Sequence, residues 1–308
     1  MAKNTNLHSA KTAKNDEFYT QLSDIENELK YYRKHFVGKV IYCNCDDARE
    51  SNFFKFFSMN FEFLGLKKLI ATGYKADGKG VKLVYEGDKN GNKIPDYDEI
   101  EVTELEGNGD FRSAECIELL KESDIVVTNP PFSLFREYVA QLVEYGKQFI
   151  IIGNKNAITY KEIFPLIKDN KLWLGVCSPN EYRLPNGEIT KQVNGLCKWF
   201  TNLDHDRRNL ELDLYMKYSN EYFPKYDNYD AIEVSKTCEI PMDYDGVMGV
   251  PITFLDKYNP NQFEIIGLSA SAGYNKNIVG IEFKGIKDAR CIVNGKNVYA
   301  RILIKHRR

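Results

Sequence analysis

The sequence predicts an α/β protein built on a mostly parallel, doubly wound sheet, with a further region added at its C-terminal end. Over residues 1–178, short apolar runs of strand type alternate with segments of helical periodicity. Beyond residue 178 this alternation weakens into a segment rich in Tyr, Asp and Asn. The 308 residues are 43% hydrophobic and 28% charged, which is typical of a folded chain with a large core. We therefore expect a core over residues 1–178 and a C-terminal region over residues 179–308 packed on it.

Each element of the core is predicted from its own pattern. Strands are expected at 39–45, 68–72, 100–105, 124–128, 148–153 and 172–178, where apolar and β-branched residues cluster. Helices are expected at 23–35, 51–63, 113–121 and 133–145, and another should begin at Thr159. Ser23 and Thr159 are each followed three residues later by Glu, the capping-box pattern that predicts a helix start.

Two Asn-Gly pairs indicate hairpins beside this alternation. Asn90-Gly91 lies between extended segments at 81–85 and 100–105, and Asn294-Gly295 lies between segments at 292–293 and 298–304. Apolar runs also return at 250–255 and 263–268, within the C-terminal region.

The charge is distributed unevenly along the chain. The net charge is −2, but residues 275–308 hold nine Lys and Arg against two acids, a balance of +7, which leaves −9 on the rest. Residues 1–15 add three lysines and no acid. Such basic ends predict contacts with the phosphates of a nucleic acid, and solvated tails are the alternative.

The seven cysteines are odd in number and scattered, so we expect free thiols in a reducing cytoplasm. Cys43 and Cys45 form a single Cys-x-Cys with no second pair, and the four histidines lie far apart, so no metal site is expected. The sequence shows no apolar signal core and no run of the ~20 residues that would span a bilayer, and we expect no membrane association.

In a doubly wound sheet, ligands bind beyond the carboxyl ends of the strands. The loops after Cys45, Thr72, Glu106, Thr128 and Gly153 should therefore line one crevice. Asn129-Pro130-Pro131-Phe132 directly follows the strand predicted at 124–128. Two successive prolines fix φ and remove both backbone donors, so the loop is rigid and its carbonyls stay available as acceptors.

This loop suits chemistry at an exocyclic amine, whose lone pair is delocalised until the nitrogen pyramidalises. The side-chain oxygen of Asn129 and the carbonyl of Pro130 can accept the two N–H hydrogens, while Phe132 offers a stacking face for an extruded base. A rigid strand-to-helix turn with a buried Phe is the alternative. The chain has no Pro-Cys dipeptide, so the covalent cysteine route of cytosine-C5 methylation has no visible nucleophile.

The segment SDIVVTNPPFSLF at 123–135 resembles the signature loop of amino-group DNA methyltransferases, in particular the family of the EcoRI adenine methylase. Further segments are similar to that family, and the likeness covers nearly the whole chain. These segments are DEFYT at 16–20, YCNCDD at 42–47, GDFRS at 109–113 and GVPITFL at 249–255. The resemblance implies a Rossmann-like fold with a catalytic core at 1–178 that binds S-adenosyl-L-methionine, and a target-recognition region at 179–308.

The resemblance also implies which residues bind the cofactor near its methionine part. Phe18, Tyr19 and Thr20 would lie over that part, although a simple lead-in to the first helix is the alternative. Asn44 and either Asp46 or Asp47 would bind the cofactor at the end of the first strand, the carboxylate holding the α-ammonium. No Gly-x-Gly turn is present there, and a helix N-cap is the rival role for the aspartates.

Other expected contacts lie on later loops. Asp110 and Phe111 would bind the cofactor adenine, with an N-cap role for Asp110 or Ser113 as the alternative. Asn129 would also face the cofactor, and the second strand ends without the acid expected for the ribose hydroxyls.

Contacts with DNA are expected from Lys155 and Asn156, with ordinary loop solvation as the alternative, and from Arg301 and Lys305 in the basic C-terminus.

The function implied is that of a sequence-specific DNA adenine-N6 methyltransferase of a type II restriction-modification system. It would be a monomer that flips adenine out of duplex DNA, within GAATTC or a related site, and pairs functionally with an endonuclease without a stable complex. Asn before Pro-Pro favours adenine over cytosine-N4. An RNA adenine methyltransferase, a protein glutamine methyltransferase and a non-catalytic DNA-binding homologue are the alternatives.

Overall fold

The computed structural model describes residues 19–45, 47–92, 94–96, 98–180, 182–183, 189–190, 195–269, 276–282, 284 and 289–307. The chain forms two compact units. The first unit comprises Met1–Lys155 and Gly175–Leu203, and the second comprises Asn156–Leu174 and Asp204–Arg308. Each unit therefore contains two segments of the chain. The boundary predicted at residue 178 falls within the segment Gly175–Leu203 of the first unit, and the earlier segment Asn156–Leu174 belongs to the second unit. The catalytic and recognition roles of the two parts stay predictions.

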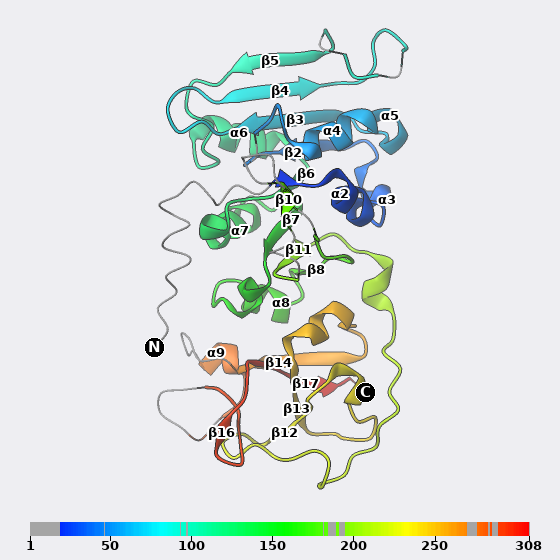
Figure 1. Cartoon of the computed structure of the whole chain (residues 1–308), viewed down its shortest axis with the longest axis vertical. Helices are drawn as coiled ribbons and strands as arrows, with labels where there is room; N and C mark the ends of the chain where they lie inside the picture. Colours follow the sequence, from blue (N-terminus) through cyan, green and yellow to red (C-terminus); the bar gives the residue numbers. More distant parts are fainter. Residues whose placement is uncertain are drawn as a thin grey trace. The chain divides into compact units, whose positions relative to one another are not determined.

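The first unit is built on a twisted sheet whose strands run in the order β5-β4-β3-β2-β6-β7-β11 (Figure 1). Strands β3, β2, β6 and β7 are mutually parallel, β4 is antiparallel to both β3 and β5, and β11 is antiparallel to β7. The strands are β2 Val40–Cys43, β3 Lys68–Gly73, β4 Val81–Tyr85, β5 Ile100–Glu104, β6 Ile125–Thr128, β7 Gln148–Asn154 and β11 Cys197–Thr201. The prediction of a mostly parallel, Rossmann-like α/β sheet is confirmed.

The order of the strands reverses at β2. From β2 the chain builds β3 on one side and then crosses to β6 on the other. The point between β2 and β6 is therefore the topological switch point, where a sheet of this type opens a crevice for ligands.

Helices cover both faces of this sheet, because neighbouring side chains of a strand point to opposite sides. Ile41 and Cys43 pack into the apolar cluster of the first helices, whereas Tyr42 points to the other face, where its hydroxyl pairs with Thr72 at 2.9 Å. The helices are α2 Leu22–Leu29, α3 Arg33–Phe36, α4 Asn52–Met59, α5 Phe61–Leu64, α6 Ala114–Glu122, the 3₁₀ helix η1 Phe132–Leu134 and α7 Phe135–Glu144. The first unit also holds a small sheet of β1 Tyr19–Thr20, β9 Tyr182–Arg183 and β10 Ile189–Thr190.

The second unit contains a four-stranded sheet in the order β12-β13-β17-β14 (Figure 1). Its strands are β12 Ala231–Glu233, β13 Val247–Pro251, β14 Phe263–Ser269 and β17 Arg301–His306. The other elements are α8 Phe164–Lys168, β8 Trp173–Leu174, η3 Asp206–Asn209, η4 Thr237–Glu239, η5 Ile252–Lys257 and α9 Lys276–Val279. The hairpin expected at Asn294-Gly295 forms, but only from β15 Ile292–Val293 and β16 Lys296–Asn297. Of the second strand predicted at 298–304, residues 301–304 belong instead to β17, which pairs with β13 and β14.

Two predicted helix starts are wrong. Helix α2 begins after Gln21 rather than Ser23, with no side-chain cap. Residues Lys155–Thr159 form the 3₁₀ helix η2, and α8 begins only after Ile163. Pro165 lies in the first turn of α8, where its fixed φ suits the helix and its missing N–H removes a donor that has no partner within the helix.

The strand predicted at 172–178 is also too long, since only Trp173–Leu174 is extended in β8. Within the described residues, no helix combines the length and the apolar character needed to cross a membrane.

Candidate active site

The loops after β2 and β6 are joined by a side chain at the switch point. The hydroxyl of Thr128, the last residue of β6, donates a hydrogen bond to the backbone carbonyl of Asn44, the first residue after β2. Both residues are buried. Asn129 therefore begins its loop from a strand end that is fixed to the neighbouring strand end.

The loop Asn129–Phe132 is short, and its two prolines fix φ at successive positions. The carbonyl of Pro131 accepts the backbone N–H of Leu134 at 2.9 Å and closes the turn of η1, which leads into α7. Pro130 is buried, and the side-chain oxygen of Asn129 is also shielded from solvent. Phe132 is only half-buried against the core cluster, so it is not an ordinary core side chain. Part of this side chain is therefore accessible to solvent.

The loop after β2 turns sharply without glycine. Cys45 takes a positive φ of 66°, the conformation that glycine usually supplies. The carboxylate of Asp47 accepts the N–H of Arg49 at 3.0 Å and is exposed. Ser51, not Asp47, caps α4 by accepting the N–H of Phe53 at 3.2 Å. The N-cap alternative is therefore wrong for Asp47.

Asp46 and Phe18 lie outside the described residues. The assignment of the cofactor carboxylate between Asp46 and Asp47 therefore stays open.

Thr20 lies beside the start of α4. Its backbone carbonyl accepts the side-chain amide of Asn52 at 2.7 Å. Its hydroxyl is buried and has no hydrogen-bond partner within the described part of the chain. A buried hydroxyl in this state is costly to the fold, which makes it a candidate ligand group. For Tyr19 the structure gives only the backbone, which pairs with Arg183.

The loops after β3 and β5 meet through close backbone contacts. The N–H of Lys75 donates to the carbonyl of Asn108 at 2.9 Å. Gly109 has a φ of +80°, and a Cβ at this position would collide with the carbonyl oxygen of Gly73. Only glycine fits there, and the chain that follows is placed at the carboxyl edge of the sheet.

Asp110 follows Gly109 and forms an ion pair with Arg112, with 2.6 Å between carboxylate and guanidinium. The hydrogen bond from Arg112 lowers the pKa of Asp110 below its usual value, so this carboxylate is ionised at neutral pH. Ser113 caps α6 by accepting the N–H of Cys116 at 3.2 Å, so Asp110 is not the cap.

Phe111 is buried, and its ring meets that of Tyr138 edge to face at 5.0 Å between centroids. The hydroxyl of Tyr138 donates to the side-chain oxygen of Asn44. Tyr138 was not among the predicted site residues. Its place on the apolar stripe of the helix predicts burial but does not show which group its hydroxyl binds.

Comparison with known proteins identifies the family of this chain. Residues 6–307 match the family model described as adenine-specific methyltransferase EcoRI. The chain is 51% identical to the type II methyltransferase M.EcoRI of Escherichia coli, with 100% of this chain and 98% of that protein covered. The chain belongs to the EcoRI adenine-specific methyltransferase family.

Relatives in other bacteria agree with this membership. The chain is 42% identical to the type II methyltransferase M.MpnI of Mycoplasma pneumoniae, with 98% of each chain covered. It is 41% identical to M.MgeORF184P of Mycoplasma genitalium, with 97% of this chain and 98% of that protein covered. The chain is thus a methyltransferase of the type II restriction-modification class.

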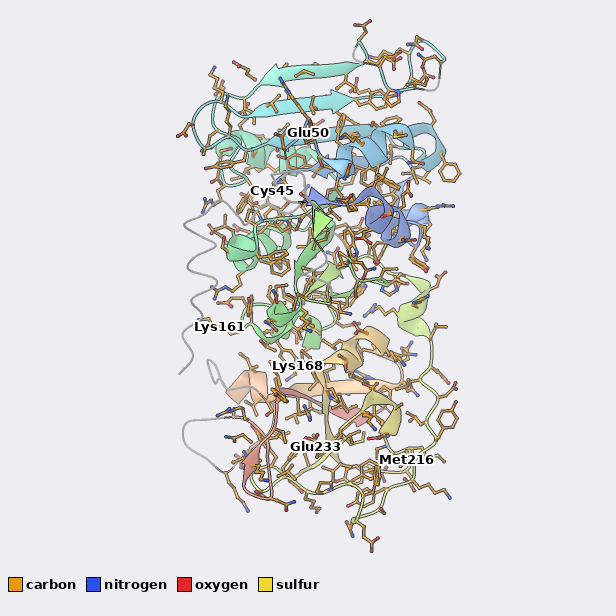
Figure 2. All side chains as sticks on the ribbon, viewed as in Figure 1. Cys45, Glu50, Lys161, Lys168, Met216 and Glu233 are labelled. Atoms are coloured by element: carbon orange, nitrogen blue, oxygen red, sulfur yellow. The ribbon has the colours of Figure 1, made fainter. Side chains whose placement is uncertain are left out.

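The expected DNA-contacting residues of this methyltransferase fall in both units. Lys155 ends the first segment of the first unit, where its N–H donates to the carbonyl of Leu196 at 2.7 Å, and Asn156 is exposed. Arg301 is largely buried in the second unit, with its guanidinium 2.6 Å from the carboxylate of Glu233 on β12 (Figure 2). Lys305 is half-exposed on β17. The geometry thus gives Arg301 a partner inside the protein, and DNA contact by these four residues stays a prediction.

Proposed function

We propose that this methyltransferase transfers the methyl group of S-adenosyl-L-methionine to N6 of an adenine flipped out of duplex DNA. The observation that carries this proposal is the fixed junction at the switch point, where Thr128 binds Asn44 and the Asn-Pro-Pro-Phe loop begins at the next residue. A rigid pair of acceptors is thereby held beside the strand end at which the fold binds its ligand.

The groups around this junction fit a cofactor that carries an ammonium, hydroxyls and a purine. Asp47 offers an exposed carboxylate, and the buried hydroxyl of Thr20 has no hydrogen-bond partner among the residues described. On the adjoining loop, the ionised carboxylate of Asp110 offers a hydrogen-bond acceptor, and the neighbouring Phe111 offers an aromatic ring. We assign these four residues to the cofactor, together with Asn44, and Asp46, Phe18 and Tyr19 remain expected members of the set. When bound, S-adenosyl-L-methionine supplies an electrophilic methyl group on a sulfonium sulfur.

The chain's own groups prepare the amine. The oxygen of Asn129 and the carbonyl of Pro130 accept the two hydrogens of the adenine amino group, which releases the nitrogen lone pair from the ring. Phe132 stacks on the flipped base with the ring face that its half-buried position leaves available. No strong base is needed beforehand, because the nitrogen becomes acidic only after it is methylated.

The substrate is tested by comparing label transfer from tritiated S-adenosyl-L-methionine to duplex DNA, structured RNA and protein. Label in DNA supports the proposal. Label confined to RNA adenine or to protein glutamine would replace it with one of those activities. Absence of transfer to all three, together with DNA binding, would indicate a non-catalytic DNA-binding protein.

The biological setting follows from the same proposal. We place target recognition in the region at 179–308, where residues 275–308 carry a balance of +7, and we assign DNA contacts to Lys155, Asn156 and Lys305. The enzyme would act in the cytoplasm as a monomer and protect DNA from a cognate endonuclease without a stable complex. If its site is GAATTC, methylated plasmid will resist an endonuclease that cuts this sequence; cutting of fully labelled plasmid would show another site.

A further inference from the structure

Tyr138 connects two loops of the cofactor edge. It lies on α7 with no exposed surface, and its hydroxyl donates a hydrogen bond to the side-chain oxygen of Asn44 after β2. Its ring packs edge to face on Phe111, which follows the loop after β5. One side chain therefore contacts residues from both ends of the predicted cofactor site.

The rest of α7 reinforces this arrangement. Gln141, one turn after Tyr138, donates its side-chain amide to the carbonyl of Phe111 at 3.2 Å. The backbone carbonyl of Asn44 is bound in turn by Thr128. Asn44 is thus held through its side chain by α7 and through its main chain by β6.

We propose that Tyr138 is a positioning residue that sets the affinity for S-adenosyl-L-methionine by holding Asn44 and Phe111 in place. This inference rests on the proposed function, because it takes Asn44 and Phe111 as cofactor contacts. Tyr138 itself is enclosed and does not need to touch the cofactor.

The hydroxyl of Tyr138 is the part of the side chain that argues for this role. A Phe would fill nearly the same volume, and a buried hydroxyl costs free energy unless it is hydrogen-bonded. Burial raises the pKa of Tyr138 well above its usual value, so the hydroxyl stays a donor throughout the working pH range. Asn44 therefore retains this hydrogen bond across that range.

The test uses the full-length enzyme with S-adenosylhomocysteine as the binding probe. Tyr138→Phe should raise the Kd for the probe and the KM for S-adenosyl-L-methionine about tenfold, as expected for one lost buried hydrogen bond. At saturating cofactor, kcat should stay within about twofold of wild type, and the Kd for DNA should not change. If Tyr138→Phe only destabilised the fold, the Tm would fall, but the KM for S-adenosyl-L-methionine would not rise at nearly constant kcat.

Tyr85→Phe is the matched control. Tyr85 is also buried and packs edge to face on Phe61 at 5.0 Å, but it pairs with Leu69, at the end of the sheet opposite the cofactor edge. This variant should leave the Kd for the probe unchanged. Gln141→Met, which removes the hydrogen bond to Phe111, should weaken probe binding in the same direction as Tyr138→Phe.

A double-mutant cycle gives the sharpest outcome. If Tyr138 acts through Asn44, adding Tyr138→Phe to Asn44→Ala should weaken probe binding by much less than it does in the wild type. Additive effects, or wild-type probe affinity in Tyr138→Phe, would overturn the inference. Because probe binding needs no methyl acceptor, failure of the wild type to bind the probe or to methylate DNA would instead count against the proposed function.

Discussion

The hydroxyl of Thr128 binds the backbone carbonyl of Asn44 across two adjacent parallel strands. Asn44 opens the loop after β2, and the residue after Thr128 is Asn129. At the switch point, the side chain of Thr128 therefore links the ends of β6 and β2 by a hydrogen bond. This places the proposed amine acceptors on the same rigid frame as the proposed cofactor contacts.

Replacing Asn129 by Ala should slow methyl transfer by about 100- to 1,000-fold, the usual cost of removing one preorganised polar group from a transition state. The Kd for DNA should stay near that of the wild type. Steady-state kinetics and DNA titration measure the two effects. Asn27→Ala, at an exposed position on α2, is the control and should be fully active. An Asn129→Ala enzyme with normal kcat would remove Asn129 from the mechanism.

Thr128→Val keeps the shape of the side chain but removes its donor. The buried carbonyl of Asn44 would lose this hydrogen bond, and the free energy of unfolding should fall by about 1–3 kcal/mol. Turnover should fall as well, because the start of the Asn129 loop is no longer fixed. Urea unfolding of the variant measures the first effect. Unchanged stability together with unchanged kcat would show that the link has no role.

Arg301 and Lys305 should behave differently although both were predicted to contact DNA. Only 12% of the Arg301 side chain and 6% of that of Glu233 is exposed, so Arg301→Ala removes the cationic partner of a buried carboxylate that keeps its hydrogen bonds from the hydroxyls of Tyr226 and Ser235. We expect the free energy of unfolding to fall by about 3–5 kcal/mol.

Lys305→Ala should instead spare stability and reduce the salt slope of DNA binding by about 0.9, as for the loss of one phosphate contact. Denaturant unfolding and DNA titrations over a range of salt concentrations separate the two effects. A stable Arg301→Ala protein with weakened DNA binding would instead support Arg301 as a direct DNA contact.

His205 should make the second unit sensitive to acid. Burial lowers the pKa of this imidazole below its ordinary value of 6.5, and its Nε2 is 3.0 Å from the carbonyl of Leu174. The unfolded chain then binds a proton more readily than the folded chain, so stability is full above about pH 6.5 and falls as pH decreases toward the lowered pKa. His205→Gln should flatten this part of the stability profile, as measured by urea unfolding from pH 5 to 8. An identical profile in the variant would assign the acid sensitivity to other groups.

The sequence predicted the features that depend on local pattern. The apolar run at 124–128 and the two prolines after it predict a buried strand followed by a turn, and the structure has this strand and this turn. The alternation of strands with helices likewise predicted the parallel core. Each helix that connects two parallel strands has a hydrophobic periodicity that differs from the periodicity of the strands beside it.

Contacts between residues far apart in the chain were not predictable in this way. Tyr138 and Asn44 are 94 residues apart, and nothing in the apolar stripe of α7 shows that this tyrosine meets an asparagine. Arg301 looked like one more cation of a basic end because its partner, Glu233, lies 68 residues earlier. The capping-box pattern at Thr159 was misleading for a local reason, since its hydroxyl instead donates to the carbonyl of Asn156 within the 3₁₀ turn.

The most direct measurement is nucleoside analysis of plasmid DNA treated with S-adenosyl-L-methionine and either the wild-type enzyme or Asn129→Ala. The account predicts N6-methyldeoxyadenosine with the wild type and almost none with the variant. N4-methyldeoxycytidine as the product, or equal N6-methyldeoxyadenosine from both proteins, would contradict it.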